Sequence, residues 1–466
     1  MKNLVKSYPV TASISIATVV LFFFSSLRHW LYHSHAWDLG IFDQAIYLIS
    51  IGKQPIVSLL EFHILGDHAA IIFYPLALLY KIHPDVHWLF AIQAIALTIG
   101  GFPLYHLSLK SGLDRDRAIT IVITYLLYPL ILNKALFDFH PEVIAIPGFL
   151  TAVLAARTNN VVLFCASIIL VLSCKSVLSL TVISMGLWLV LCEHKRKCGA
   201  IAIAIGVAWF IISIQFIIPT FLGNAVGGTI GAIARYSYLG SSIPEIAANI
   251  IIKPDLILGK LFSLETLEYI FLLLLPISWG CSPRYLLPLL STVPMLLINI
   301  LSMLPAQRNL IHQYSIPILP FLFLVVIGTV ANNQNWLKTR RSILVWAVIS
   351  FALMGKISYF WSDYLSSLDT QQSITVAIAK IRDDESVLTT GEIAPHLTHR
   401  QNIKLTFNGT ESIDLKEFKY VLLERRHPGW NSSRETLDKL KSRAEESGLF
   451  NLEYQQDDVY LFTRRK

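Results

Sequence analysis

The segment Trp37-Asp38-Leu39-Gly40-Ile41-Phe42-Asp43-Gln44 places two carboxylates close to hydrocarbon. It follows the first long apolar run, residues 10–27, so both acids are expected just outside a membrane span, at the start of a long loop. A carboxylate near hydrocarbon costs free energy and usually has a reason to be there. Catalysis, transport and plain solvation are the three reasons that the segment itself leaves open.

The spacing of the two acids separates their possible roles. Asp38 and Asp43 are five residues apart, so on a helix they do not share one face well. One of them would line a site, and Asp38, beside Trp37, is the stronger candidate. The alternative is a solvated acid that caps the helix beginning near Leu39.

The elements that position these acids are membrane spans. Hydrophobic residues make up 54% of the 466 residues and charged residues 15%, with a mean hydropathy of +0.57. Soluble domains carry about a quarter charged residues. The composition therefore predicts a polytopic α-helical membrane protein with about eleven transmembrane helices. The predicted spans are residues 10–27, 87–109, 118–136, 142–157, 160–174, 177–192, 200–222, 267–281, 285–303, 314–331 and 342–360.

The distribution of charge predicts the topology. Residues 1–364 hold 23 Lys and Arg and 15 Asp and Glu, and residues 365–466 hold 15 and 16. This excess in the membrane part indicates topology and not nucleic-acid binding. If residues 69–82 lie in the interface and do not span, the basic clusters at 110–117 and 195–197 fall inside. The N-terminus is then cytoplasmic and the C-terminus extracytoplasmic.

This topology gathers the unusual polar side chains at the outer face. They are Asp38, Asp43, His63, Asp67, His68, Asp138, His140, Glu142, Lys175, Arg235, Arg308 and His312. The spans themselves hold almost no charge, whereas a proton-coupled transporter more often places ionisable groups near the midplane.

Two domains are predicted, residues 1–364 with a long first outer loop (28–86), and residues 365–466. Strands are expected at 387–389, 403–407, 420–423 and 459–462, with a short helix at 392–399. An amphipathic helix is expected at 432–447, with Ser432 or Ser433 as N-cap and Gly448 as its end. The tail is thus a small α/β domain without a phosphate-binding loop or nucleophile motif.

Several motifs occur in a fixed order along the chain. They are Asp38–Gln44, Gly66-Asp67-His68 and Asp138-Phe139-His140-Pro141-Glu142, followed by Lys175, Tyr238-Leu239-Gly240 and His312-Gln313-Tyr314. In this ordered set the chain resembles domain-of-unknown-function family 2079 of prokaryotic membrane proteins. That family is similar to the C-type (GT-C) glycosyltransferase superfamily, whose members use sugars linked to polyprenyl phosphate. The resemblance implies a plasma-membrane enzyme of the cell envelope with membrane-parallel helices in its first outer loop.

The resemblance also implies roles for individual residues. Asp38, or more weakly Asp43, would be the general base that takes the acceptor's proton. Phosphate and substrate contacts would come from His68, Asp138, His140, Lys175, Arg235 and His312. A divalent cation is a weaker expectation, with Asp67, His68, Asp138 and His140 as candidate ligands, because no tight ligand spacing occurs. The alternatives are helix-start acids for Asp138 and Glu142 and interfacial cations for the basic residues, especially Arg308.

One position departs from the family pattern. The family usually shows Lys-Glu-Asp where this chain has Lys175-Ser176-Val177, so two acids are missing. If those acids bind metal or substrate, this member differs in substrate or is inactive. A lipid or solute transporter or flippase and a non-catalytic membrane scaffold therefore remain alternatives to the enzyme. The donor sugar, the acceptor and the oligomeric state have no signature in the residues.

Overall fold

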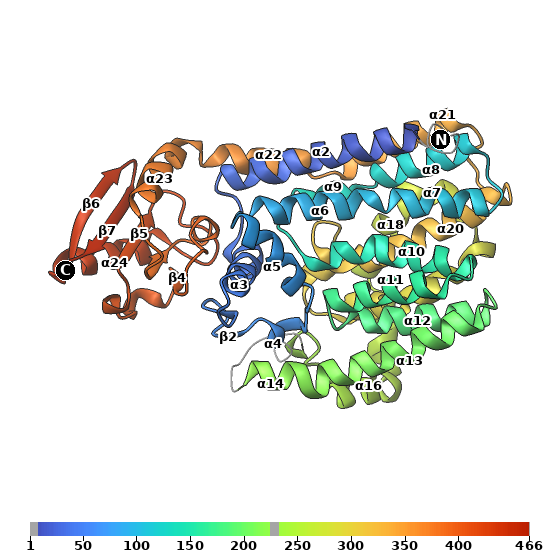
Figure 1. Ribbon diagram of the computed structural model, residues 1–466, viewed down its shortest axis with the longest axis horizontal. Helices are drawn as coiled ribbons and strands as arrows, with labels where there is room; N and C mark the ends of the chain where they lie inside the picture. The colour runs from blue at the N-terminus through green and yellow to red at the C-terminus, as the bar shows by residue number, and fades with distance from the viewer. Residues whose placement is uncertain (1–7, 224–232, 466) are drawn as a thin grey trace. The chain divides into compact units, whose positions relative to one another are not determined.

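The computed structural model describes residues 8–223 and 233–465, and Gly231 of the glycine-containing loop before Arg235 lies outside them. The chain is mostly helical and divides into two compact units, which are described separately (Figure 1). Unit 1 comprises residues 1–23, 65–72 and 91–356, and unit 2 comprises residues 24–64, 73–90 and 357–466. The division falls within α2 (Tyr8–Trp30) and α6 (His87–Ile99).

Unit 1 is a body of α-helices joined by short turns and 3-10 segments. Its α-helices are α4 (Leu65–His68), α7 (Gly101–Lys110), α8 (Arg115–Leu126), α9 (Pro129–Ala135), α10 (Ala145–Arg157), α11 (Val161–Cys174), α12 (Leu178–Leu191), α13 (Arg196–Ile212), α14 (Ile218–Leu222), α16 (Ile243–Ile252), α17 (Pro254–Leu261), α18 (Leu264–Leu274), α19 (Val293–Leu301), α20 (Leu319–Ala331) and α21 (Arg340–Met354). The 3-10 and π segments are η2 (Pro141–Ile144), η3 (Ser213–Ile217), η4 (Leu275–Gly280), η5 (Pro283–Tyr285), η6 (Leu287–Thr292), η7 (Pro305–Arg308) and η8 (Gln313–Ile318).

Five helical stretches among the described residues are long and apolar enough to cross a membrane. They are Tyr8–Trp30, His87–Lys110, Arg196–Leu222, Pro305–Ala331 and Arg340–Ser366. Two bent helix pairs, within residues 115–135 and 254–280, raise the number to seven. The predicted eleven spans are not confirmed, because α10, α11, α12 and α19 have only 9 to 14 residues. A helix needs about 20 residues to cross ~30 Å of hydrocarbon.

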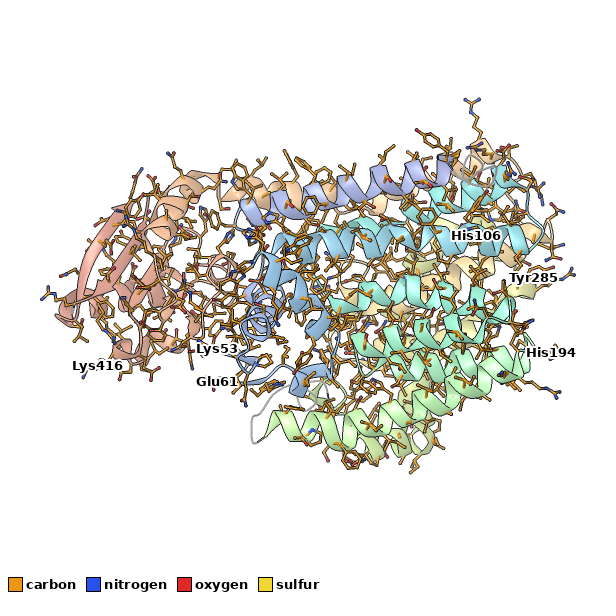
Figure 2. The ribbon with its side chains drawn as sticks, in the orientation of Figure 1. Lys53, Glu61, His106, His194, Tyr285 and Lys416 are labelled. Atoms are coloured by element: carbon orange, nitrogen blue, oxygen red, sulfur yellow. The ribbon has the colours of Figure 1, made fainter. Side chains whose placement is uncertain are left out.

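Consecutive helices pack side by side in unit 1, with α10 against α11 and α12 against α13 (Figure 1). Polar contacts join the loops that the sequence predicts to be cytoplasmic. Arg157 Nη2 lies 2.7 Å from Glu193 Oε1, and Lys195 Nζ donates to Asn159 Oδ1 at 2.9 Å. Likewise, Arg117 Nη1 donates to Asn333 Oδ1 at 3.0 Å. Figure 2 labels His106 of α7, His194 of the loop between α12 and α13, and Tyr285 of η5, all toward one end of unit 1.

Unit 2 combines the first loop with the tail. From the first loop come η1 (Ala36–Gly40), α3 (Ile41–Ser50), β1 (Ile56–Val57), β2 (Phe62–His63) and α5 (Phe73–Ile82). From the tail come α22 (Ile357–Ser366), α23 (Leu368–Lys380), β3 (Val387–Thr389), η9 (Ala394–His396), β4 (Ile403–Leu405), η10 (Thr410–Ser412), η11 (Leu415–Glu417), β5 (Tyr420–Glu424), α24 (Arg434–Glu446), β6 (Phe450–Gln456) and β7 (Val459–Arg464). The apolar helix α5 has 10 residues, about 15 Å, too short to cross a bilayer.

The tail forms a five-stranded sheet in the order β4-β3-β5-β7-β6. β4, β3 and β5 are parallel, and β7 is antiparallel to both of its neighbours. Successive residues point to opposite faces of a strand, so Leu422 and Leu461 join one core while Val421 and Phe462 join another. The first core includes residues of α23, η1 and η9, and the second includes residues of α24.

Most of the predicted tail elements occur where the sequence places them. The predicted strands correspond to β3, β4, β5 and β7, and the predicted helix 432–447 corresponds to α24. Ser433 is its N-cap, because its hydroxyl accepts from Thr436 N–H, and Gly448 follows its end at a positive φ of 67°. The predicted helix 392–399 is only the short segment η9. Neither β6 nor α23 was predicted from the sequence.

Candidate functional site

The segment carrying Asp67 and His68 is fixed against the turn between α11 and α12. Ile72 N–H donates to Ser173 O at 3.0 Å, and Ser176 N–H donates to His68 O at 2.9 Å. These two backbone hydrogen bonds bring His68 and the turn containing Lys175 together within unit 1.

A glycine permits close packing on the other side of α4. A Cβ atom on Gly66 would lie 2.7 Å from the backbone nitrogen of Leu222, at the end of α14. Only a residue without a side chain allows this approach. Close packing therefore explains why the first residue of the motif Gly66-Asp67-His68 is glycine.

A buried ion pair links the two central motifs. Lys175 Nζ lies 2.7 Å from Glu142 Oε1, and their side chains are only 12% and 5% exposed. Burial lowers the pKa of Lys175, but Glu142, Asp67 and Tyr314 together raise it by more, so the net pKa is above its ordinary value. Glu142 Oε2 is buried and has no hydrogen-bond partner among the residues the structure describes. Glu142 Oε2 is therefore a buried hydrogen-bond acceptor without a donor among these residues.

The charged groups around this pair shift the pKa of His68. Its Nε2 lies 3.2 Å from Asp67 Oδ2. Burial lowers the pKa of His68 to about 4, against the opposing effect of Asp67, and the charges of Lys175 and Arg235 lower it further. The imidazole is therefore neutral near pH 7, and both cations lie close enough to act on it.

Arg235 and His312 approach the same part of unit 1 from the second half of the chain. The Arg235 guanidinium lies 5.7 Å from the centre of the Tyr314 ring. Segment η8, which begins directly after His312, packs against η2, which contains Glu142. The His312 ring lies 5.0 Å from that of Phe137. The segments that carry Glu142, Arg235 and His312, which were predicted as separate motifs, are therefore joined near the Glu142–Lys175 pair.

His140 and Asp138 are buried beside a cation that the prediction of site residues missed. Lys134 is 0% exposed, and its Nζ lies 2.8 Å from His140 Nδ1. His140 N–H also donates to Gln93 Oε1 at 3.3 Å, while Asp138 is itself 0% exposed. A charge inside an apolar run is a known mark of function, and Lys134 within residues 118–136 carried that signal.

Arg308 has a structural role. Its Nη1 donates to Ser302 O at 2.5 Å and reaches Ile300 O at 3.3 Å. These carbonyl groups end α19, whose last turn would otherwise lack donors. Arg308 therefore caps the C-terminal end of α19.

The candidate metal ligands Asp67, His68, Asp138 and His140 are not gathered into one group. Across residues 8–223 and 233–465, no three His, Cys, Asp or Glu side chains are grouped so that they could hold an ion. Ser176 and Val177, which follow Lys175, carry no carboxylate. Glu142 supplies the carboxylate that meets Lys175.

Asp38 and Asp43 belong to unit 2. Asp38 lies in η1 and is partly exposed, whereas Asp43 in α3 is 1% exposed. Asp43 Oδ1 accepts from Tyr80 Oη at 2.5 Å, and its Oδ2 accepts from Thr398 Oγ1. His399 Nε2 lies 3.2 Å from Asp43 Oδ2 as a charge contact. The two acids therefore have different environments.

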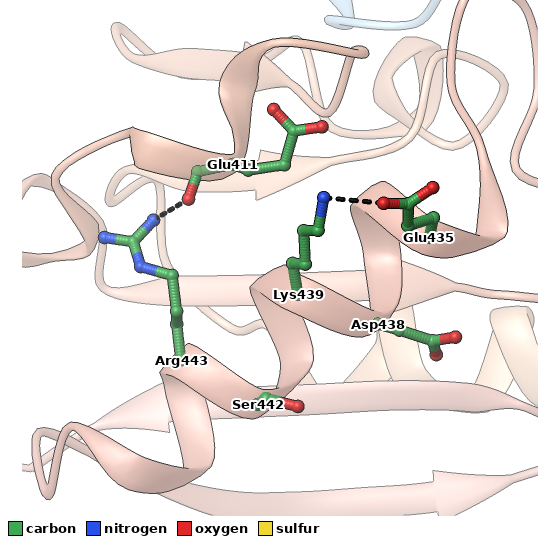
Figure 3. A pocket seen from close by; sticks show the side chains of 6 residues that line it. All are labelled: Glu411, Glu435, Asp438, Lys439, Ser442 and Arg443. Atoms are coloured by element: carbon green, nitrogen blue, oxygen red, sulfur yellow. Dashed lines mark hydrogen bonds and ion pairs between the residues drawn. The ribbon is translucent and has the colours of Figure 1, made fainter.

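A shallow polar hollow lies on α24 of the tail (Figure 3). It is lined by Glu411, Glu435, Asp438, Lys439, Ser442 and Arg443. Its charges are engaged with one another, since Lys439 Nζ lies 2.7 Å from Glu435 Oε1 and Arg443 donates to the Glu411 carbonyl. This surface has the character of a solvated helix face.

The fold has a counterpart among solved structures. ArnT from Cupriavidus metallidurans bound to undecaprenyl phosphate is similar with a TM-score of 0.50 and 11% identity, over 98% of each chain. ArnT from the same organism in the apo state gives a TM-score of 0.42 at 12% identity, over 96% of this chain and 98% of that chain. At this identity the first similarity indicates a shared GT-C-like fold, and the second is too weak to add to it.

A family assignment comes from the sequence as a whole. No curated relative matches it. The family model described as "Predicted membrane protein (DUF2079)" matches residues 28–461. This match spans both units and every motif discussed above, and the chain therefore belongs to the DUF2079 family of predicted membrane proteins.

Proposed function

We propose that this protein is a GT-C glycosyltransferase that takes a sugar from a polyprenyl-phosphate donor at the outer face of the plasma membrane. The observation that carries the proposal is the buried Lys175–Glu142 pair, which lies next to His68 through the Ser176 N–H to His68 O hydrogen bond, with Arg235 held at the Tyr314 ring, within the helical body of an ArnT-like fold. Cations held in a poorly solvated place stabilise the charge on a leaving phosphate more strongly than they would in water. That ArnT binds undecaprenyl phosphate supports a lipid of this class.

The residues divide into three roles. Lys175, Arg235, His68, His140, Asp138 and His312 bind the phosphate and the adjoining sugar. Glu142 orients Lys175, and its unused Oε2 accepts a hydroxyl group of the donor. Asp38, which is partly exposed, is the general base, and Asp43, which is 1% exposed, is the weaker candidate.

The topology and domain division are part of the proposal. The N-terminus is cytoplasmic, and residues 365–466 form an extracytoplasmic domain following a membrane domain of residues 1–364. The contacts among the basic loops support this orientation, because they place those loops together.

Binding and turnover test the proposal separately. Purified protein in lipid nanodiscs is titrated with undecaprenyl phosphate and analysed by native mass spectrometry. K175M and R235M should each weaken binding at least tenfold, whereas R284M, at an exposed cation of η5, should not. Equal affinity in all four proteins would refute the phosphate site.

Turnover is measured with a panel of undecaprenyl-phosphate-linked sugars and a membrane extract as the source of acceptor. Release of free undecaprenyl phosphate is followed by liquid chromatography and mass spectrometry. The D38N variant should lose turnover while keeping lipid affinity. A fully active D38N variant would refute the assignment of the base, and lipid binding without turnover in the wild type would favour the transporter or scaffold.

A further inference from the structure

The tail covers one side of the acidic segment of unit 2. Ala36 N–H donates to Gly391 O at 3.1 Å, which ties the start of η1 to the loop after β3. The Trp37 ring stacks on Phe407 with 5.8 Å between ring centres. Residues 391–407 of the tail thus hold both the backbone of Ala36 and the side chain of Trp37.

The same tail segment holds the end of the acidic motif. Gln44 Nε2 donates to Arg400 O at 2.9 Å, and Ser58 Oγ donates to Ile403 O at 2.9 Å. Nearby, Lys404 forms an ion pair with Glu61, which Figure 2 labels. The first loop therefore contacts both backbone carbonyl groups and a side chain of residues 400–404, which include part of β4.

Asp43 is the charged centre of this contact. Thr398 Oγ1 donates to Asp43 Oδ2, and His399 Nε2 lies 3.2 Å from the same oxygen. The His399 ring stacks on Tyr47 with 4.6 Å between centres, which fixes its orientation. Asp43 is 1% exposed, and a buried carboxylate held in this way resists rotation of its helix.

Asp38 lies between two residues that are buried in unit 2, two positions after Ala36 and two before Gly40. Ala36 is tied to the tail by its N–H, and a Cβ on Gly40 would lie 3.5 Å from Thr398 Cγ2. Asp38 itself is partly exposed. The contacts with the tail therefore fix the backbone on both sides of Asp38.

We propose that Thr398 and His399 of the tail are positioning residues for Asp38, acting through Asp43 and the helical segment 36–44. This inference rests on the proposed function of Asp38 as general base. It gives the tail a part in the reaction, in place of the structural or partner-binding role that its lack of motifs suggests. A displacement of about 1 Å in a reacting group can cost about 10²-fold in rate, so small losses of fixation are measurable.

The test compares four variants in the turnover and lipid-binding assays. T398V removes the hydroxyl donor while keeping the shape, T398S keeps the donor, and H399Q removes the cation. T406V is the matched control, because Thr406 is a buried tail threonine whose hydroxyl has no partner among the described residues.

T398V and H399Q should lower kcat about 10²-fold with unchanged undecaprenyl-phosphate affinity. T398S should recover kcat to within a few fold, and T406V should match the wild type. Wild-type kcat in T398V, or a parallel loss of lipid affinity and kcat in T398V and T398S, would overturn the positioning role.

Two further measurements separate this inference from the proposed function. If D38N is inactive but T398V is fully active, only the positioning role fails. If the wild type turns over no donor, or D38N is fully active, the proposed function fails. Carbodiimide labelling of Asp38, quantified by peptide mass spectrometry, then tests the positioning role without turnover. An equal labelling rate in T398V and wild type overturns the inference, and a changed rate that T398S reverses supports it.

Discussion

Lys175 and Glu142 form a buried ion pair, with 2.7 Å between Nζ and Oε1, from segments that are 33 residues apart in the chain. Glu142 is the second residue of η2, the short segment before α10, and Lys175 lies between α11 and α12. Their pairing gives Lys175 a carboxylate partner from a different segment of the chain.

Removing one member of this pair should destabilise the protein. E142Q leaves a buried ammonium without its counter-charge, and the expected cost is ~3–5 kcal/mol. Thermal unfolding in detergent should show a clearly lower Tm. The double variant E142L/K175M, which removes both charges, should recover most of the loss; a double variant as unstable as E142Q would contradict the pairing.

The ion pair between His399 and Asp43 should make stability depend on pH. Burial lowers the pKa of His399, but Asp43 and Asp85 together raise it by more, so the folded-state pKa exceeds the unfolded value of about 6.5. The stabilisation is fully present below about pH 6.5 and is lost as the pH rises through the folded-state pKa. The Tm difference between wild type and H399Q should therefore shrink as the pH rises above about 6.5, and it should not depend on pH in a D43N background. A difference that grows with pH would be inconsistent with this pair.

Substitution of Gly66 should disturb the packing of α4 on α14. A Cβ at this position would lie 2.7 Å from Leu222 N, a backbone atom that cannot move aside cheaply. G66A should cost about 1–3 kcal/mol, as overpacking usually does, and lower the Tm. G259A is the control, because nothing lies within 4 Å of its Cβ position. Equal Tm values for the two variants would argue against the close approach.

The N-cap of α24 should be Ser433 alone. Its hydroxyl accepts from the Thr436 N–H, whereas the buried Ser432 hydroxyl has no partner among the described residues. S433A should lose about 1 kcal/mol of tail stability, measurable by hydrogen exchange of the α24 amides. S432A should leave those exchange rates unchanged, and the reverse order would show that the other serine caps the helix.

A reporter can decide the topology. Alkaline phosphatase fused after residue 466 should be active, because that enzyme folds only outside the cytoplasm, whereas green fluorescent protein at the same place should be dark. The same pair fused within residues 193–197 should give the opposite result. Fluorescence after residue 466 would reverse the proposed orientation.

Much of the class and of the tail could be predicted because both depend on local patterns. Long apolar runs predicted a membrane protein, and the turn residue Gly448 marked the end of α24. The eleven predicted spans are not confirmed, because the predicted spans 142–157, 160–174 and 177–192 correspond to α10, α11 and α12, which have only 13 or 14 residues each. β6 was missed because its outward residues are mostly exposed and polar.

The sequence by itself determined the membrane class, the family and the set of polar residues, since composition, hydropathy and ordered motifs are local properties of the chain. Only the tertiary structure decided which charges meet. It paired Lys175 with Glu142, buried Lys134 beside His140, and brought Thr398 to Asp43 across 355 residues. Such pairs depend on packing between distant segments, and no local periodicity encodes the partner of a buried charge.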